Sequence, residues 1–164
     1  MATIERIKDF SLKGRIGVIT KQKNHSARLA WQHMPENDNI DIYSPLGGKV
    51  AHIVKTSEQV TLTDSKQKVL HAKDTETLTK DTLGFSLPLA GLSYWSLGKP
   101  SNMSIANKMT WDDSGRITTL EQDGWIIEFK NYSVNETYTL PNKVTLKNGQ
   151  ITIKLIIDKW VEIK

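Results

Sequence analysis

The chain has 164 residues, of which 38% are hydrophobic and 24% charged, a composition typical of a folded globular protein. The formal net charge is +4 and the charges are scattered, so we expect solvated strand faces rather than a nucleic-acid-binding stripe. The absence of cysteine excludes disulfides, thiolate zinc sites and cysteine nucleophiles. The sequence contains neither a run of about 20 apolar residues, as a membrane span requires, nor a recognisable signal peptide.

The first half of the chain alternates apolar and polar residues, which is the pattern of half-buried β-strands. The N-terminal segment, residues 1–9, is mixed and predicts a helical turn or two. Gly14 and Gly17 lie within the first strand, where we expect sites of close packing or bending. Short strands at such regular spacing favour an antiparallel sandwich or barrel. The predicted strands cover residues 10–18, 27–32, 40–42, 50–55, 60–63 and 68–72.

Two helices are predicted in the middle of the chain. Asp74 is a suitable N-cap for a helix that runs to about Leu83, and Gly84 is a suitable terminator. Pro88 stands where a second helix would begin and Gly98 where it would end. This second helix has a strongly apolar face, formed by Leu89, Leu92, Trp95 and Leu97.

The second half of the chain returns to strands. The pairs Asp123-Gly124 and Asn148-Gly149 predict tight hairpin turns. In total we expect ten or eleven strands and two or three short helices in a single domain, residues 1–164. Such a sheet curls with its apolar face inward and either fills its interior or encloses a cavity. The further strands are predicted at residues 109–112, 117–122, 125–130, 144–147 and 150–157.

No catalytic, metal-binding or cofactor-binding motif is recognised in the sequence. The histidines lack a metal-ligand spacing such as H-E-x-x-H, and we interpret them as polar residues on strand faces. Asp112 and Asp113 precede Ser114-Gly115, which is turn chemistry rather than an acid–base pair. We therefore expect a protein that is not an enzyme. The histidines are His25, His33, His52 and His71.

The segment Pro45-Leu46-Gly47-Gly48 is a short loop with an apolar residue at its tip. One interpretation is that Leu46 folds back on the core or is one of many single exposed leucines. The other is that a protruding leucine contacts a membrane or an apolar ligand.

Several motifs follow one another across residues 10–160. They are LKGR at 12–15, SARLAW at 26–31, SPLG at 44–47, LGFSLPL at 83–89, LSYWSLGKP at 92–100, GRI at 115–117, LEQDGW at 120–125, LP at 140–141 and LIIDKW at 155–160. In their order and spacing the chain resembles the LolB family of outer-membrane lipoprotein receptors.

The resemblance implies an incomplete antiparallel β-barrel wrapped on helices, with a hydrophobic cavity for lipoprotein acyl chains. It implies a LolA-like soluble carrier as donor, triacylated lipoproteins as cargo and the inner leaflet of the outer membrane as acceptor. It also implies that the leucine of the Pro-Leu-Gly loop protrudes and is needed for delivery. In this chain that loop is Pro45, Leu46 and Gly47.

One feature departs from the family pattern. Family members are lipoproteins, anchored at the periplasmic face of the outer membrane through an acylated N-terminal cysteine that follows a signal peptide. This sequence has neither. We expect a truncated, soluble form that begins near Met1-Ala2; a native start at Met1 would instead leave the localisation in doubt.

The inward strand residues and the helix leucines are the candidates for a cavity lining, although a packed core uses the same residue types. Transfer would run downhill between apolar environments, with no nucleotide, metal or cofactor. The candidates are Trp31, Leu89, Leu92, Trp95, Ile153 and Leu155.

Alternative functions remain open from the sequence. A lipid or acyl-chain carrier module would tolerate a charge at Leu46. A packed β interaction domain would bind no acyl probe. Single-stranded nucleic-acid binding would use the aromatic residues and basic balance, but the scattered charge argues against it. We expect a monomer.

Overall fold

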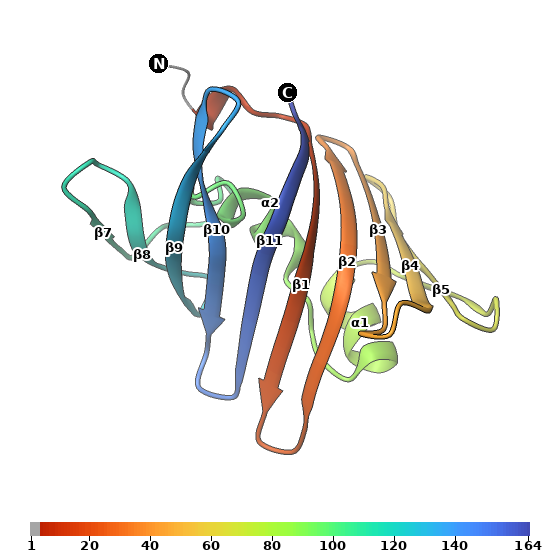
Figure 1. Ribbon diagram of the computed structural model, residues 1–164. Coiled ribbons are helices and arrows are strands. Elements are labelled where there is room, and N and C mark those ends of the chain that lie inside the picture. Colours follow the sequence, from red (N-terminus) through yellow and green to blue (C-terminus); the bar gives the residue numbers. More distant parts are fainter. Residues whose placement is uncertain (1–3) are drawn as a thin grey trace.

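One antiparallel sheet of eleven strands dominates the computed structural model, which describes residues 4–164 (Figure 1). The strand order is β6-β5-β4-β3-β2-β1-β11-β10-β9-β8-β7. The strands are β1 (Phe10–Thr20), β2 (Asn24–Met34), β3 (Asn37–Tyr43), β4 (Lys49–Lys55), β5 (Val60–Asp64), β6 (Val69–Ala72), β7 (Lys108–Trp111), β8 (Ile117–Gln122), β9 (Trp125–Asn135), β10 (Tyr138–Lys147) and β11 (Ile151–Ile163). The helices are the 3-10 helix Ile4–Arg6, α1 (Thr75–Leu83) and α2 (Leu89–Trp95).

The sheet curls around α1 and α2 and remains open (Figure 1). Within residues 4–164 its two edges, β6 and β7, pair with no further strand. The prediction of an incomplete antiparallel barrel of ten or eleven strands on short helices is therefore confirmed. Both helices also lie where the sequence predicted them. Asp74 caps α1 through its carboxylate, which accepts a hydrogen bond from the Thr77 amide at 2.7 Å.

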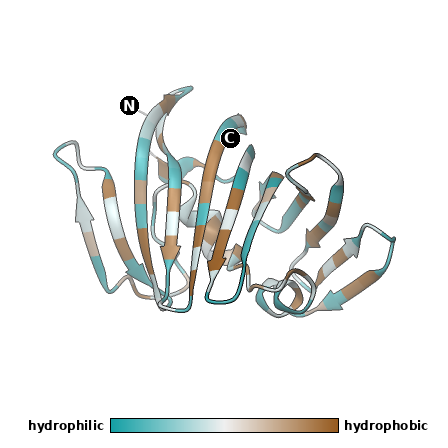
Figure 2. Ribbon diagram, turned by 60° about the horizontal axis from the view of Figure 1, so that its bottom comes forward, coloured by the Kyte–Doolittle hydropathy of each residue, from teal (hydrophilic) through white to brown (hydrophobic). Residues whose placement is uncertain are grey.

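Alternation of apolar and polar residues determines which face of each strand is buried (Figure 2). In β1, Phe10, Leu12, Ile16 and Val18 point inward and are buried. Together with the inward residues of the other strands and the helix leucines they form one continuous core. The concave face of the sheet is therefore apolar, and the convex face carries most of the charged strand residues.

Three strands in the second half are longer than predicted. β10 begins at Tyr138 and includes Pro141, which a sequence pattern would place outside a strand. Its partner β9 has a left-handed residue at Asn131 (φ 59°), opposite the unpaired step between Pro141 and Lys143. The irregular pairing there accommodates the missing amide of proline.

β11 extends to Ile163 because two bulges restore its alternation. The register of β1 against β11 shifts between Ser11 and Leu12 and again between Lys13 and Gly14. Each shift adds one residue to β11, and a bulge of this kind keeps the following side chains on the correct face. The strand pattern in the sequence stops at Ile157 because the bulged residue Asp158 interrupts it.

Gly14 and Gly17 differ in their surroundings, although both were predicted as close-packing or bending sites. A Cβ added at Gly14 would collide with the carbonyl oxygen of Ile156 and approach the Ile157 Cα atom to 3.4 Å. A Cβ added at Gly17 would meet nothing within 4 Å. Close backbone approach is thus confirmed at Gly14 and is absent at Gly17.

This difference predicts opposite effects for two matched substitutions. We expect Gly14→Ala to lower the free energy of unfolding by about 1–3 kcal/mol, because the added methyl group forces β1 and β11 apart. Gly17→Ala should be neutral or should stabilise by up to about 1 kcal/mol by restricting the unfolded chain. Urea unfolding of both variants measures this, and equal destabilisation by the two substitutions would contradict the packing argument.

Candidate functional site

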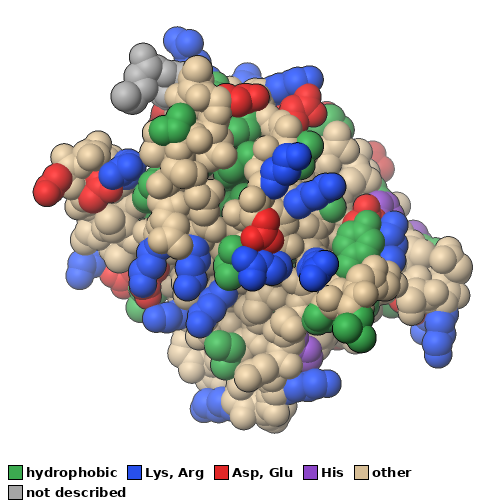
Figure 3. All heavy atoms as spheres, in the orientation of Figure 1, with side chains coloured by type: hydrophobic (Ala, Val, Ile, Leu, Met, Phe, Trp, Pro, Cys, Tyr) green, Lys and Arg blue, Asp and Glu red, His purple; other side chains and the backbone are tan. Residues whose placement is uncertain are grey.

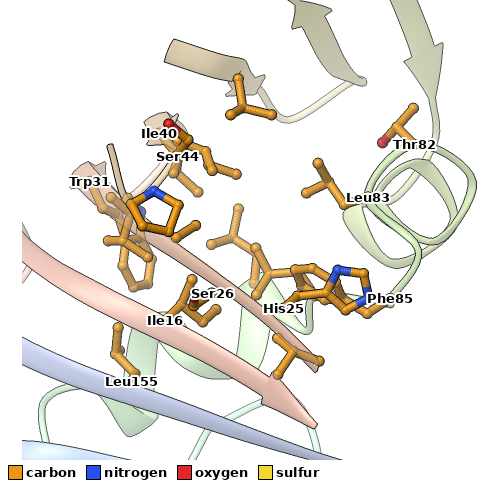
Figure 4. Close-up of a pocket in the computed structure, with 18 of the residues that line it drawn as sticks. Ile16, His25, Ser26, Trp31, Ile40, Ser44, Thr82, Leu83, Phe85 and Leu155 are labelled. Carbon is orange, nitrogen blue, oxygen red and sulfur yellow. The ribbon is translucent and has the colours of Figure 1, made fainter. Parts of the chain in front are cut away.

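An apolar cavity of about 350 Å³ lies between the helices and the N-terminal half of the sheet (Figure 4). Strands β1 to β4 supply one wall, and α2 and the end of α1 supply the other. A single residue of β11, Leu155, completes the lining. Such a space suits an apolar ligand. The apolar side chains that line it include Ile16, Val18, Ala27, Leu29, Trp31, Ile40, Ile42, Leu83, Phe85, Leu87, Leu89, Leu92 and Leu155.

The structure brings together four of the six predicted lining residues, namely Trp31, Leu89, Leu92 and Leu155. The other two, Trp95 and Ile153, lie outside the cavity lining. Trp95 is 1% exposed, and its indole N–H donates to the Gln122 side-chain oxygen at 2.8 Å. Ile153 is fully buried between its strand neighbours Val18 and Leu146. Apolar type and inward direction alone do not distinguish cavity lining from solid core.

Phe85 and His25, at the cavity mouth, were not identified from the sequence as cavity residues. Gly84 ends α1 in the left-handed conformation (φ 85°) and turns the chain so that Phe85 lines the cavity. The rings of Phe85 and His25 lie 5.7 Å apart at their centroids. Figure 4 shows both rings on the same side of the cavity. The sequence signal for this part of the cavity was Phe85, an aromatic residue directly after the glycine that ends α1. His25 gave no such signal, because it resembles any histidine on a strand face.

The inner end of the cavity is formed by Trp31, which a buried carboxylate holds in place. Its indole N–H donates to Asp38 at 2.8 Å, and the same carboxylate oxygen lies 2.6 Å from His33 Nδ1. Phe10 packs edge-on against the indole ring, with the ring centroids 4.9 Å apart. Hydrogen bonds from two rings compensate the burial of Asp38, which is only 5% exposed. Trp31 therefore forms a fixed wall rather than a mobile one.

A second depression of about 660 Å³ lies beyond Trp31, and its lining is mixed, with a larger polar share than that of the apolar cavity. It is bordered by Asp38, Lys55, Tyr94 and Lys99, among others. Burial lowers the pKa of the Lys99 ammonium group, while the charge of Glu5 acts in the opposite direction. Desolvating such groups against an acyl chain is unfavourable. The apolar cavity is therefore the better candidate for a lipid site.

Leu46 stands at the corner of a tight turn beside the cavity mouth. The Gly47 amide donates to the Ser44 carbonyl at 2.9 Å, and the Ser44 amide donates to the Gly48 carbonyl at 2.8 Å. Proline at the second position and Gly47 in the left-handed region (φ 104°) suit a type I turn with a following glycine. The turn directs the Leu46 side chain away from the protein, where it is 99% exposed. Pro45 of the same turn lines the cavity.

Among residues 4–164 there is no group of three His, Asp or Glu side chains positioned to hold a metal ion. No helix in the described part of the chain is long and apolar enough to cross a membrane. Three of the histidines instead pair with a residue on the neighbouring strand, His33 with Asp38, His52 with Asp41 and His71 with Thr61.

Comparison with solved structures identifies related folds. The crystal structure of a LolA superfamily protein from Nitrosomonas europaea matches with a TM-score of 0.59 and 7% identity, over 93% of this chain and 85% of that one. A DUF1329 family protein from Desulfovibrio piger matches with a TM-score of 0.52 and 5% identity, over 96% of this chain and 86% of that one. At these identities the similarity concerns the fold alone.

Comparison of sequences identifies the family. The outer-membrane lipoprotein LolB of Thiobacillus denitrificans is 37% identical over 151 residues, which cover 92% of this chain and 79% of that protein. The LolB of Cellvibrio japonicus is 32% identical over 161 residues, 96% of this chain and 79% of that protein. The family model for the outer membrane lipoprotein LolB matches residues 8–160. The chain therefore belongs to the LolB family.

Proposed function

We propose that this protein is a lipoprotein-localisation factor that receives acylated lipoproteins in its apolar cavity and inserts them into the outer membrane. The observation that carries the proposal is the position of a fully exposed leucine, Leu46, on a turn that borders the mouth of the cavity. In this proposal the cavity binds an acyl chain and the adjacent Leu46 turn contacts the bilayer. Membership of the LolB family supports this assignment.

The energetics of acyl chains explain why such a cavity is needed. Each methylene transferred out of water contributes about 0.8 kcal/mol, so a triacylated protein does not cross the periplasm unaided at a useful rate. The cavity of about 350 Å³ lies near the lower end of the range for small-ligand pockets, about 300–1,000 Å³. We infer that the mouth between α1 and the Leu46 turn must widen to admit three chains.

We further propose that the donor is a LolA-like carrier and that transfer needs no nucleotide or catalysis. A similar curled sheet occurs in a LolA superfamily protein, so donor and receptor would offer the acyl chain comparable apolar interiors. Direction then comes from affinity differences of a few kcal/mol between carrier, receptor and bilayer. The protein would act as a monomer at the periplasmic face of the outer membrane.

Leu46→Glu tests the membrane step. We expect this variant to take cargo from the carrier normally but to lose most delivery to liposomes, because a carboxylate at the tip cannot enter the apolar part of the bilayer. The measurement mixes the protein with LolA carrying a triacylated lipoprotein, without nucleotide, and follows the cargo before and after liposomes are added.

Val134→Glu is the matched control, since Val134 is 72% exposed on a strand remote from the cavity lining. Normal delivery by Leu46→Glu would favour a lipid carrier module that never inserts its cargo. Cargo that stays on LolA with the wild-type protein would contradict the receptor function altogether.

Filling the cavity tests the acyl-chain step separately. Ala27 lines the cavity from β2, and we expect Ala27→Trp to weaken binding of a fluorescent long-chain fatty acid by at least about tenfold, because the indole occupies the ligand space. Ala30→Trp places the same side chain on the convex face of the same strand and should bind the probe normally. If the wild-type protein binds no probe, the packed β-domain alternative is correct.

A further inference from the structure

The two ends of the barrel carry opposite charge on their turns. In an antiparallel sheet of consecutive strands, alternate turns lie at the same end. The turns β1–β2, β3–β4, β5–β6, β8–β9 and β10–β11 lie at one end, which we call the Leu46 end. The turns β2–β3, β4–β5, β7–β8 and β9–β10 lie at the other, which we call the distal end (Figure 1).

Lysines predominate at the Leu46 end. The β1–β2 turn carries Lys21 and Lys23, and the β5–β6 turn carries Lys66 and Lys68. All four are exposed. Among the hairpin turns at this end Asp123 is the one acidic residue, and Asp81 of α1 lies next to the cavity residue Thr82. Figure 3 shows basic side chains on the hairpin at the bottom of the molecule and on the turn at its right edge.

Acidic residues predominate in the turns of the distal end, where the chain-terminal residues Arg6, Lys8 and Lys164 also lie. Its turns carry Glu36, Glu58 and Glu136, and the β7–β8 turn carries Asp112 and Asp113 with Arg116. Arg116 is paired with Asp112 at 2.9 Å. The net charge of +4 is therefore unevenly distributed along the strand direction. Such a charge distribution orients a protein relative to a charged surface.

The side chains of the four lysines are unpaired in the part of the chain that the structure describes. Among residues 4–164 none of them lies within salt-bridge distance of a carboxylate. Lys49, which directly follows the Leu46 turn, differs because it pairs with Asp41 at 3.1 Å, an interaction that raises the pKa of Lys49. The two lysine-bearing turns are thus free to bind an external anion.

The lysines are also close to the cavity mouth. Lys23 and Pro45 line the same cavity, which places the β1–β2 turn beside the Leu46 turn. On the other side Asp64, at the start of the β5–β6 turn, pairs with Ala51 at the beginning of β4. The Leu46 turn therefore lies between the two lysine-bearing turns. The exposed side chains of Ile19 on β1 and Val50 on β4 lie at the same end.

We infer that the Leu46 end is a docking surface for a bilayer rich in anionic phospholipids, with Lys21, Lys23, Lys66 and Lys68 binding the headgroups. This inference rests on the proposed membrane delivery and names the lipid class that delivery requires. An exposed apolar tip flanked by unpaired lysines matches the two components of interfacial binding, apolar insertion and attraction to anionic lipid. The acidic distal end is repelled by the same surface, so the cavity mouth and Leu46 face the membrane.

Vesicle co-sedimentation without cargo tests the inference. The variant replaces all four lysines with glutamine, and the matched control replaces Lys8, Lys13, Lys73 and Lys159, which lie away from these turns, so that both proteins have the same net charge. Two kinds of vesicle are compared. The neutral vesicles contain phosphatidylethanolamine and phosphatidylcholine, and in the anionic vesicles phosphatidylglycerol makes up about one quarter of the lipid. A lysine near an anionic surface contributes on the order of fivefold in binding.

We expect the wild-type protein to prefer the anionic vesicles, and the preference to weaken at high salt. With about fivefold per lysine, the quadruple variant should lose roughly several hundredfold in binding and the control less than about threefold, and both should still take cargo from the carrier. Equal loss in variant and control would assign the effect to net charge and overturn the inference. It would also be overturned if the variant bound vesicles normally but failed to take cargo, because the lysines would then contact the carrier. Neither result would disturb the delivery role of Leu46, which Leu46→Glu tests separately.

Discussion

The pairing of β1 with β11 is the constraint on which the rest of the structure depends. Strands β1 to β6 form one consecutive antiparallel series and strands β7 to β11 form another. Within residues 4–164, only the pairing of the first strand with the last joins the two series into one sheet. Two bulges and the close backbone approach at Gly14 adjust this contact, and Phe10 packs across it against Trp160 at 5.5 Å between ring centroids. Because the junction fixes the curl of the sheet, it also fixes the space left between sheet and helices.

The two series use their concave faces differently. In the C-terminal series Leu120, Ile127, Leu146 and Ile153 are fully buried, and Gln122 holds the Trp95 ring of α2 against them. That half is a solid core and supports α2. The N-terminal series faces α1, which is longer than α2 but more polar and does not fill the space, and the apolar cavity lies there. One half thus provides the stability that allows the other half to remain unfilled.

The sequence predicted the strands, both helices and several of the hairpin turns, because alternation, caps and Asp-Gly or Asn-Gly pairs are local signals. It did not predict where strands would continue past Pro141 or Asp158, since those continuations depend on the partner strand. Four of the six cavity candidates line the cavity, but Trp95 and Ile153 do not. Trp95 is held outside the cavity lining by its hydrogen bond to Gln122, and Ile153 by its packing between neighbouring strands. Both sets of contacts involve residues distant in sequence. Leu46 was correctly located on a loop, yet its full exposure follows only from the geometry of the turn.

The turns at the Leu46 end show why this part of the fold is suited to function. In a strand, burial restricts every second position to apolar residues. In a turn, the choice of residue is restricted mainly at the position that needs a left-handed backbone. In the β3–β4 turn Gly47 meets that requirement, so the neighbouring Leu46 is free to be apolar without affecting the fold. In the β5–β6 turn the Asp64 carboxylate accepts hydrogen bonds from the amides of Lys66 and Lys68, which leaves both lysine side chains unrestricted. Because alternate turns meet at one end of an antiparallel sheet, residues that are far apart in sequence form a single surface around the cavity mouth.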